Sequence, residues 1–324
     1  MIRTRVCDLL SIELPIALGG MGSVYGIDLV AAVSEAGGLG ALGCSLLGPD
    51  EVKKAAADIR VKTDKPFALN FLIFMPNEAG FEAALEARPA AMAFAWPRPE
   101  QDLKPFFDRA HEAGCKVTFM AGDVPEARRA AEAGADVIIA QGTEGGGHVN
   151  WMATMTLVPM VVDAVAPVPV MAAGGVADGR GLAAALALGA DGVLLGTRFL
   201  ASEESPLHPN FKQAIVDSDG HDTMLTEIPD IASGRVWPGA MARARRNNFV
   251  DRWAGREWAL RQNQAEAWAG IQSARSAGDA EEAYLLYGQD AGLVNDLPPA
   301  GEIVRRIAAE AEEILTRKLP GLVG

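Results

Sequence analysis

Residues 132–142 read EAGADVIIAQG, and this stretch joins the end of a helix to a short buried strand. The Ala-Gly pair is typical of a helix C-terminus, because glycine adopts the left-handed conformation that ends many helices. The apolar run that follows lacks the alternation of a half-buried strand and is typical of a strand buried on both faces. A helix that leads directly into such a strand indicates a right-handed βαβ unit in a parallel sheet.

The same arrangement recurs at residues 35–43, 112–122 and 186–197. By strand criteria the chain up to residue 197 contains the apolar runs PIALGG, GLGALG, PFALNFLI, AAMAFAW, CKVTFMAG, ADVIIAQG, VPVMAAGG and ADGVLLGT. Eight is the number of parallel strands that closes a TIM barrel. The sequence therefore predicts the α/β class and a TIM (β/α)8 barrel, with a doubly wound open sheet as the structural alternative.

Beyond residue 199 the pattern changes, and we expect a barrel over 1–219, an inserted helical lid subdomain over 220–300 and a C-terminal helix over 301–324. The lid region shows no clear buried strand but holds four of the six tryptophans. In the last region apolar residues recur every four positions, which predicts an amphipathic helix that packs back on the barrel. These apolar positions are Ile303, Ile307, Ala311 and Leu315.

Charge and cysteine content exclude several classes of protein. The net charge of −13 repels nucleic acid and anionic membranes, so neither is expected as a partner. Cys7, Cys44 and Cys115 form no CxxC pattern, which argues against a disulfide framework and a zinc site. Acidic residues and prolines interrupt the apolar stretches that would otherwise resemble a signal peptide or a membrane span. We expect a cytoplasmic enzyme that acts on small molecules and binds no metal.

Glycines gather directly after the first, seventh and eighth predicted strands. The C-terminal ends of the strands carry the active site of a TIM barrel, and the last two loops are its usual phosphate site. Free backbone N–H groups in such loops receive an anion. The two later clusters, at 174–175 and 196–197, therefore predict a phosphorylated ligand, whereas tight βα turns are the alternative explanation.

The stretches GGMG, AGGLG, QGTEGGGH and AAGGVADGRG with GTRFL closely resemble the nitronate monooxygenase family, also called 2-nitropropane dioxygenases. The resemblance extends to YGQDAGLVNDLPPAGEIV near the end of the chain. Members of this family are FMN-dependent TIM barrels, related to NADH:quinone reductases and to one type of FMN-dependent enoyl-ACP reductase. The resemblance thus implies an FMN cofactor and the same fold.

On the flavin-ring side, the resemblance implies that the backbone around Gly20, Met21 and Gly22 lies against the ring. Asn70, after the third strand, is implied to lie near the ring or the ribityl chain. Some quinone-reductase relatives carry a lysine at the end of the fifth strand, where this sequence has Met120. A missing positive charge weakens electrostatic stabilisation of a reduced anionic flavin, so their cofactor preference does not transfer directly.

Further along the chain, the resemblance implies that Gln141 hydrogen-bonds within the same site. It implies that Gly146 and Gly147 allow the cofactor to approach closely. The residues implied to hold the phosphate are Gly174, Gly175, Gly196 and Thr197.

His148 follows this glycine run and is the candidate catalytic residue. An imidazole titrates near neutrality, so it can take the α-proton of a nitroalkane, bind an anionic nitronate or protonate a reduced product. In the resembling family the histidine of this motif has such roles, whereas an ordinary polar loop residue is the alternative. Glu144 either orients this loop or caps a turn.

The other polar candidates are expected to be structural. His208 is assigned to a loop, whereas His111 and His221 are expected on a helix exterior and in an acidic loop. The basic run at 243–246 is typical of a solvated helix face, with contact to a nucleotide phosphate as the alternative. Trp237 is a candidate roof for the flavin, although most lid tryptophans are expected to pack the lid itself. No Ser/His/Asp arrangement is recognisable around Ser23 or elsewhere.

The leading functional hypothesis is FMN-dependent oxidation of alkyl nitronates by O₂ to a carbonyl compound and nitrite. The alternative is an NAD(P)H-dependent FMN reductase of quinones or enoyl thioesters. A barrel without FMN, such as a phosphosugar isomerase or a binding protein, is a third reading of the phosphate loops. Expected partners are a small-molecule substrate and O₂, with a homodimer as an alternative to a monomer.

Overall fold

A closed barrel of eight parallel strands forms the body of the protein in a computed structural model that describes residues 2–21 and 25–322. The strand order is β1-β9-β8-β6-β5-β4-β3-β2. All eight apolar runs of the sequence form these strands, so that prediction is confirmed. The bounds are β1 Ile16–Leu18, β2 Gly40–Gly43, β3 Phe67–Leu72, β4 Ala91–Ala95, β5 Lys116–Ala121, β6 Val137–Gln141, β8 Val170–Ala173 and β9 Gly192–Leu195.

The two ends of this sheet meet and close the barrel. Ala17 of β1 forms a parallel bridge with Leu39, just before β2. The Leu18 N–H donates to the Leu39 carbonyl at 2.9 Å, and the Leu39 N–H donates to the Ile16 carbonyl at 2.9 Å. Closure excludes the doubly wound open sheet and confirms the TIM barrel.

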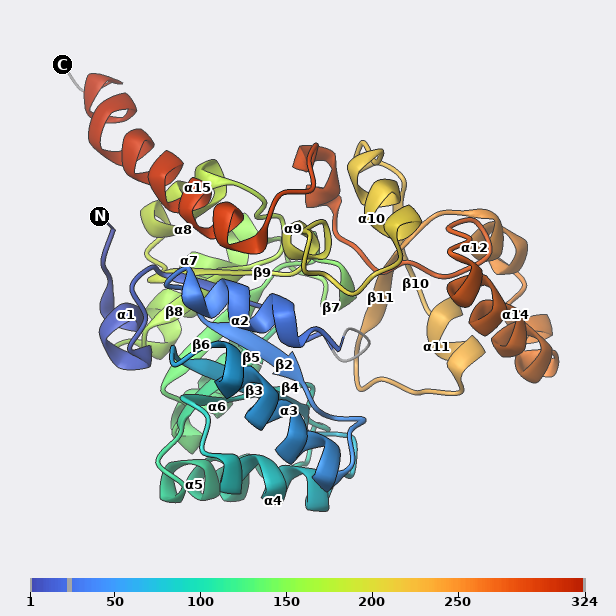
Figure 1. Cartoon of the computed structure of the whole chain (residues 1–324), viewed down its shortest axis with the longest axis horizontal. Coiled ribbons are helices and arrows are strands. Elements are labelled where there is room, and N and C mark those ends of the chain that lie inside the picture. The colour runs from blue at the N-terminus through green and yellow to red at the C-terminus, as the bar shows by residue number, and fades with distance from the viewer. Residues whose placement is uncertain (1, 22–24, 323–324) are drawn as a thin grey trace.

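Seven helices alternate with the strands and surround the sheet (Figure 1). Side-chain caps begin three of them, where Asn77, Asp123 and Asp178 accept from backbone N–H groups of the first turn. A short helix, α9 Thr197–Leu200, follows β9. The surrounding helices are α2 Ile27–Glu35, α3 Pro49–Lys62, α4 Glu78–Ala87, α5 Lys104–Glu112, α6 Val124–Ala133, α7 Thr154–Val165 and α8 Gly179–Ala187.

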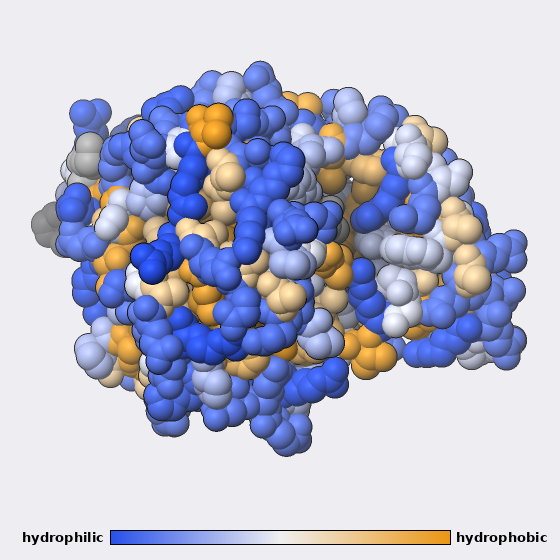
Figure 2. Space-filling view, turned by 60° about the horizontal axis from the view of Figure 1, so that its bottom comes forward, coloured by the Kyte–Doolittle hydropathy of each residue, from blue (hydrophilic) through white to orange (hydrophobic). Residues whose placement is uncertain are grey.

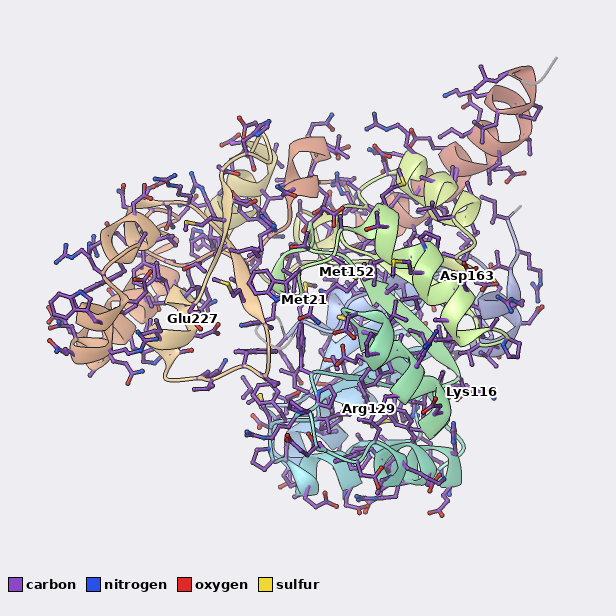
Figure 3. The ribbon with its side chains drawn as sticks, turned by 180° about the vertical axis from the view of Figure 1, so that it is seen from behind. Met21, Lys116, Arg129, Met152, Asp163 and Glu227 are labelled. Carbon is purple, nitrogen blue, oxygen red and sulfur yellow. The ribbon has the colours of Figure 1, made fainter. Side chains whose placement is uncertain are left out.

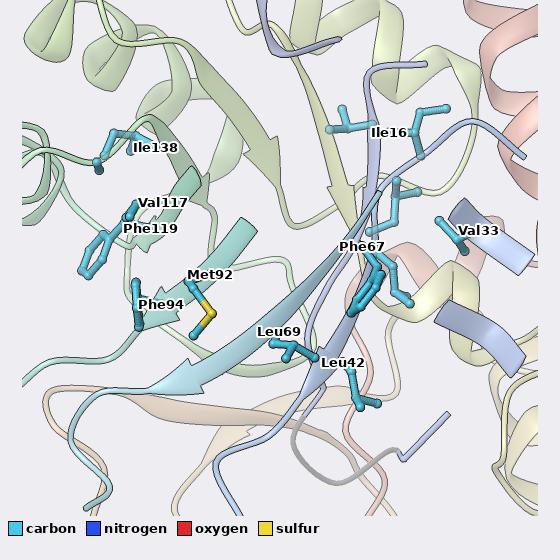
Figure 4. Packing of buried hydrophobic residues seen from close by; sticks show 14 of the residues in the cluster. Ile16, Val33, Leu42, Phe67, Leu69, Met92, Phe94, Val117, Phe119 and Ile138 are labelled. Atoms are coloured by element: carbon cyan, nitrogen blue, oxygen red, sulfur yellow. The ribbon is translucent and has the colours of Figure 1, made fainter. Parts of the chain in front are cut away.

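Two packed cores stabilise the barrel. The larger one lies between the sheet and its helices, and Figure 4 shows side chains such as Leu69, Met92 and Phe119 within it. A smaller core fills the barrel interior, where Val6, Cys7 and Leu10 of α1 Arg5–Leu10 pack against interior residues of the strands. Because α1 closes this end, the barrel is open to ligands only at the C-terminal ends of its strands.

A lobe projects from the C-terminal face of the barrel (Figure 1). It has its own hydrophobic core, which includes Ile231, Phe249 and Leu260. Its elements, with the helix that leads into it and the turn that follows it, are α10 Pro209–Val216, β10 Thr223–Thr226, α11 Ile228–Ser233, β11 Met241–Arg245, α12 Asn248–Trp253, α13 Glu257–Gln262, α14 Gln264–Ala277 and η1 Gln289–Leu293.

The lobe is mainly helical, but two strands that the sequence did not indicate, β10 and β11, form an antiparallel sheet with β7 Gly147–Val149. The run MARAR was interpreted as a solvated helix face but forms β11. Arg243 is buried there, and its guanidinium donates to the Thr143 carbonyl at 2.8 Å and to the Thr223 hydroxyl at 3.2 Å. Those carbonyl and hydroxyl partners explain how a charged side chain occupies a buried strand position.

The terminal helix α15 Ala300–Glu313 packs against α8 and α2, as expected from its apolar spacing. Ile303, Ile307 and Ala311 are buried in the outer core of the barrel. Short turns, η2 Ile314–Lys318 and η3 Pro320–Leu322, complete the described chain. Within its described residues, no helix is both long and apolar enough to span a membrane.

Candidate active site

A cavity of about 550 Å³ lies between the C-terminal ends of the barrel strands and the lobe. In the space-filling view the surface is hollowed between the barrel body and the lobe (Figure 2). Figure 3 shows Met21 at this junction and Glu227 on the lobe. Both parts of the molecule contribute lining residues, so the cavity is the candidate active site.

Two glycine turns line the barrel side of this cavity. Gly174 and Gly175 follow β8 with φ angles of 88° and 75°, a region that L side chains rarely adopt. Gly196 follows β9, and a Cβ there would point into open space. In the described chain, the N–H groups of Gly175, Val176 and Gly196 donate to no acceptor. This arrangement fits an anion, as the sequence predicted.

The flavin-ring candidates follow β1 and β3 at the same barrel mouth, and β1 is the neighbour of β9. Asn70, at 7% exposure, donates its amide to the Ala93 carbonyl at 3.2 Å. A Cβ on Gly20 would overlap the Asn70 side chain, so glycine is required there. Gly20, Met21 and Asn70 all line the cavity. Gly22, the remaining candidate of this group, lies outside the described residues.

Gln141 ends β6 and also lines the cavity. Its Oε1 is buried and finds no hydrogen-bond partner in the described part of the chain. Two further orphaned atoms of the cavity lining are Trp237 Nε1 and Asp290 Oδ1. Buried polar atoms without partners are unfavourable unless a ligand or water satisfies them, so the lining is polar enough to receive a ligand with its own donors and acceptors.

Gly146 and Gly147 have different structural reasons to be glycine. A Cβ on Gly146 would lie 2.5 Å from the Cα and carbonyl carbon of Tyr287 and 2.6 Å from Gly288 N. The backbone of residues 287–288 therefore approaches Gly146 closely. Gly146 also lines the cavity, and its expected role of letting the cofactor approach stays a prediction. Gly147 adopts a φ of 74°, with open space where a Cβ would be.

His148 lies on β7, at the line where the barrel loop meets the lobe sheet. Its Nε2 is 2.9 Å from Asp230 Oδ1 and 3.0 Å from Oδ2. Both side chains are nearly buried, at 9% and 11% exposure. Because the carboxylate accepts a hydrogen bond from Nε2–H, Nδ1 is the ring nitrogen that remains for a substrate.

Aromatic side chains fix the plane of this imidazole. The Trp237 ring stacks on His148 with centroids 3.4 Å apart and planes at 13°. Trp96 meets both rings edge to face, and its φ of 57° is unusual for a bulky residue. Trp237 therefore covers the histidine from the lobe side, which limits the rotation of the ring.

Three groups of the cavity were missed by sequence reasoning. Asp230 lies on α11, far from His148 in sequence. Arg235 and Arg275 line the cavity, and neither guanidinium has an acidic partner among the described residues. Arg275 instead lies over the Tyr284 ring, 4.5 Å from its centroid.

The third missed group is the segment 287–290, which crosses between two barrel loops. The Gly288 N–H donates to the Thr197 hydroxyl, and the Gln289 N–H donates to the Glu144 carbonyl, each at 2.9 Å. Thr197 is thereby fixed beside the second glycine turn. The family-like sequence YGQDAGLV was a signal for this segment, although nothing in it indicated which loops it joins.

The remaining candidates have structural partners. The Glu144 carboxylate accepts from the Thr154 N–H at 3.0 Å and from its hydroxyl at 3.0 Å, so Glu144 caps α7. His208 Nδ1 accepts from the Asn210 N–H at 3.2 Å and caps α10, although its side chain also lines the cavity. Met120 also lines the cavity.

Among the residues that the structure describes, the cysteines and carboxylates form no metal site. Cys7, Cys44 and Cys115 are free and buried, and burial raises the pKa of Cys44 to about 12. In the described ranges no cluster of three or more His, Cys, Asp or Glu side chains is arranged to hold a metal ion.

Comparison with known proteins places these features in a family. The sequence profile described as "Nitronate monooxygenase" matches residues 3–95 and 81–310. A (3aS,4S,5R,7aS)-5-hydroxy-7a-methyl-1-oxo-octahydro-1H-indene-4-carboxyl-CoA dehydrogenase from Mycobacterium tuberculosis is 34% identical over 96% of both chains. A probable nitronate monooxygenase from Staphylococcus saprophyticus is 30% identical, over 98% of this chain and 99% of that protein.

Two solved structures are also similar to this chain. FabK from Thermotoga maritima is 38% identical, with complete coverage of both chains and a TM-score of 0.89. A nitroalkane oxidase from Streptomyces ansochromogenes is 30% identical over 96% of this chain and 99% of that one, with a TM-score of 0.83. These similarities show an oxidoreductase enzyme with a TIM barrel fold.

Proposed function

The chain belongs to the nitronate monooxygenase family, and we propose that it is an FMN-dependent oxidoreductase whose substrate is a thioester of the coenzyme A or acyl-carrier type. The observation that carries this proposal is the position of His148. Its imidazole is fixed by Asp230 and Trp237 at the edge of a cavity that also contains two glycine turns with free amides.

The residues of the cavity fit a flavin in size and chemistry. The free amides near Gly175 and Gly196 suit a phosphate, and the orphaned Gln141 Oε1 suits a donor on a flat heterocycle. Asn70 and Met21 would lie against the ring, and Thr197 beside the phosphate. Bound there, the flavin supplies two-electron redox chemistry that no side chain of the cavity provides.

Within this proposal His148 transfers the proton. Asp230 keeps Nε2 protonated and stabilises the imidazolium, so Nδ1 exchanges the proton with the carbon next to the thioester carbonyl. The buried His–Asp pair and the covering Trp237 keep water from this atom. In an enoyl thioester His148 would donate to that carbon as the β-carbon is reduced, and in a dehydrogenation it would remove the same proton.

Two features support a thioester with a large anionic carrier. The cavity extends beyond the glycine turns to Arg235, Arg275 and Tyr284 of the lobe. In a chain with a net charge of −13, guanidinium groups without acidic partners at a cavity favour a phosphate-bearing substrate. The similarity to a carboxyl-CoA dehydrogenase supports the same substrate class.

Nitronate oxidation is the second candidate, supported by the family profile and by the similarity to a nitroalkane oxidase. The same His148 would hold an anionic nitronate, and O₂ would be the oxidant that yields a carbonyl compound and nitrite. This reaction needs neither arginine of the lobe.

Anaerobic reduction of the bound flavin distinguishes the two candidates. We expect NADH or NADPH to bleach the flavin of the purified protein and crotonyl-CoA to restore its absorbance. Rapid bleaching by propionate 3-nitronate, with nitrite formed once O₂ is admitted, would support the second candidate instead. Protein that contains no flavin after purification and reconstitution would overturn both.

A further inference from the structure

Asp290 is a buried carboxyl group that neither reading of the function uses. It lies on η1 and lines the floor of the cavity, with 6% of its surface exposed. Its Oδ1 is fully buried and has no hydrogen-bond partner in the described part of the chain. A buried acceptor with no donor is costly, so its presence in a cavity lining points to a ligand.

The surroundings of Asp290 place it at the phosphate end of the cavity. Its carboxyl group hydrogen-bonds to the hydroxyl of Thr197, the residue that follows the glycine turn of β9. Thr197 in turn accepts from the Gly288 N–H at 2.9 Å. A Cβ added to Gly288 would overlap Asp290 Oδ1, which shows how closely this segment surrounds the carboxyl group.

The charges around Asp290 are unfavourable for a bound phosphate as long as Asp290 itself is ionised. Glu144 lies nearby, and its carboxylate is already used to cap α7. The nearest cation, Arg198, is paired with Asp296 at 2.9 Å. An ionised Asp290 would therefore add repulsion to any phosphate at the two glycine turns, with no free cation among the described neighbours to offset it.

Burial is the main cause that raises the pKa of Asp290, to about 7. The hydrogen bond from Thr197 and the charge of Arg198 lower this pKa in part, whereas the charge of Glu144 raises it. A phosphate dianion at the turns would raise the pKa further. With a phosphate bound beside it, the carboxyl group is therefore mostly protonated near pH 7, and a neutral carboxyl can donate a hydrogen bond where a carboxylate cannot.

Building on the proposed function, we propose that Asp290 is a flavin-binding residue that acts as a neutral carboxylic acid, with its proton shared with the 5′-phosphate end of FMN. Binding of FMN then takes up a proton wherever free Asp290 is ionised. Affinity is complete below pH 7 and falls as the pH rises above it. The 5′-phosphate is the cause, so riboflavin should not show this loss.

The test is the FMN dissociation constant of the full-length protein, measured by flavin fluorescence between pH 6.5 and 8.5, with riboflavin as the second probe. In the wild type we expect the FMN constant to rise roughly tenfold or more across this range, because each pH unit above the pKa costs up to a factor of ten. The riboflavin constant should stay within about twofold, since it lacks the phosphate.

Variants with one charge removed sharpen the test. Asp290→Asn puts a neutral side chain of the same shape in this position. Its FMN dissociation constant should therefore be independent of pH and, at pH 8.5, lower than that of the wild type. Glu126→Gln is the matched control, because burial raises the pKa of Glu126 to about 7 as well, yet Glu126 does not line the cavity. This control should keep the pH dependence of the wild type.

Each outcome either supports or overturns the role of Asp290. A wild-type FMN constant that does not rise with pH, or riboflavin that weakens as FMN does, overturns the role of Asp290 while the proposed function stands. Protein that binds no flavin at any pH overturns the proposed function together with this inference. The comparison of FMN with riboflavin needs only the wild type, so it holds even if Asp290→Asn does not fold.

Discussion

The barrel wall and the lobe wall of the cavity present different chemistry to a ligand. The barrel wall is largely backbone, with glycine turns after β1, β8 and β9. The lobe wall is made of side chains such as Asp230, Trp237 and Arg275. His148 lies between them, because β7 leaves the barrel and pairs with β11 of the lobe.

This difference suggests that the two walls of the cavity have different roles. Under the proposed function, backbone amides and open glycine positions would hold the flavin. Side chains on a separate lobe can change without disturbing the barrel, so they can fix the substrate and the proton-transfer step. Substitutions that change one side chain at a time, in one wall or the other, test this difference.

The largest effect is expected for His148→Ala, which removes the proton-transfer group and leaves the barrel wall intact. Catalytic efficiency should fall by about 10²–10⁴-fold, the usual contribution of general acid–base catalysis. FMN content should be unchanged. His111→Ala is the matched control, since His111 pairs with Asp136 at 2.8 Å outside the cavity; equal turnover in both variants would contradict the assignment.

Gly146→Val should destabilise the contact between the barrel loop and the segment 287–288. The new side chain meets the Tyr287 backbone, which cannot move aside as a flexible side chain would. We expect a loss of about 1–3 kcal/mol in the free energy of unfolding, as for overpacked cores. Thermal unfolding against Gly270→Val, whose Cβ meets open space, checks this; equal midpoints would refute it.

Asp230→Asn tests whether the lobe orients the histidine. The amide keeps the shape but removes the counter-charge of the imidazolium, so kcat should fall about tenfold to thirtyfold, which is less than for loss of the histidine itself. Asp136→Asn changes the equivalent partner of His111 and should leave kcat unchanged.

The smallest effects are expected for Arg235→Gln and Arg275→Gln. Each should raise KM for crotonyl-CoA by about twofold to fivefold, as partly exposed charge pairs contribute up to about 1 kcal/mol. KM for the N-acetylcysteamine thioester, which lacks the phosphates of coenzyme A, should not change. Arg305→Gln on α15 serves as control, and identical changes for both thioesters would show that the arginines do not recognise phosphate.

The barrel was predictable because its signals are local. Each strand follows a helix end such as the Ala-Gly at 133–134 within a few residues, and each glycine turn directly follows its strand. The small sheet of the lobe was not predictable, since β11 contains two arginines and its partner β7 has only three residues. Their pairing depends on a tertiary contact rather than on hydrophobic alternation.

In the candidate site, too, the residues of the barrel wall were more predictable than those of the lobe wall. Nearly all described candidates of the barrel wall line the cavity, although the neighbour of Gly146 proved to be the chain itself. The partner of His148 was missed because 82 residues separate it from Asp230. Asp290 was missed because its burial, and not its sequence context, makes it unusual.

The FMN content of Gly196→Val tests the central claim most directly. The added side chain would occupy open space in the glycine turn after β9, where φ is negative, so the fold should be retained. We predict that the wild type contains one FMN per chain and that the variant, with an unchanged thermal midpoint in the absence of flavin, loses it. Full FMN occupancy in Gly196→Val, or none in the wild type, would contradict a backbone cradle for the cofactor.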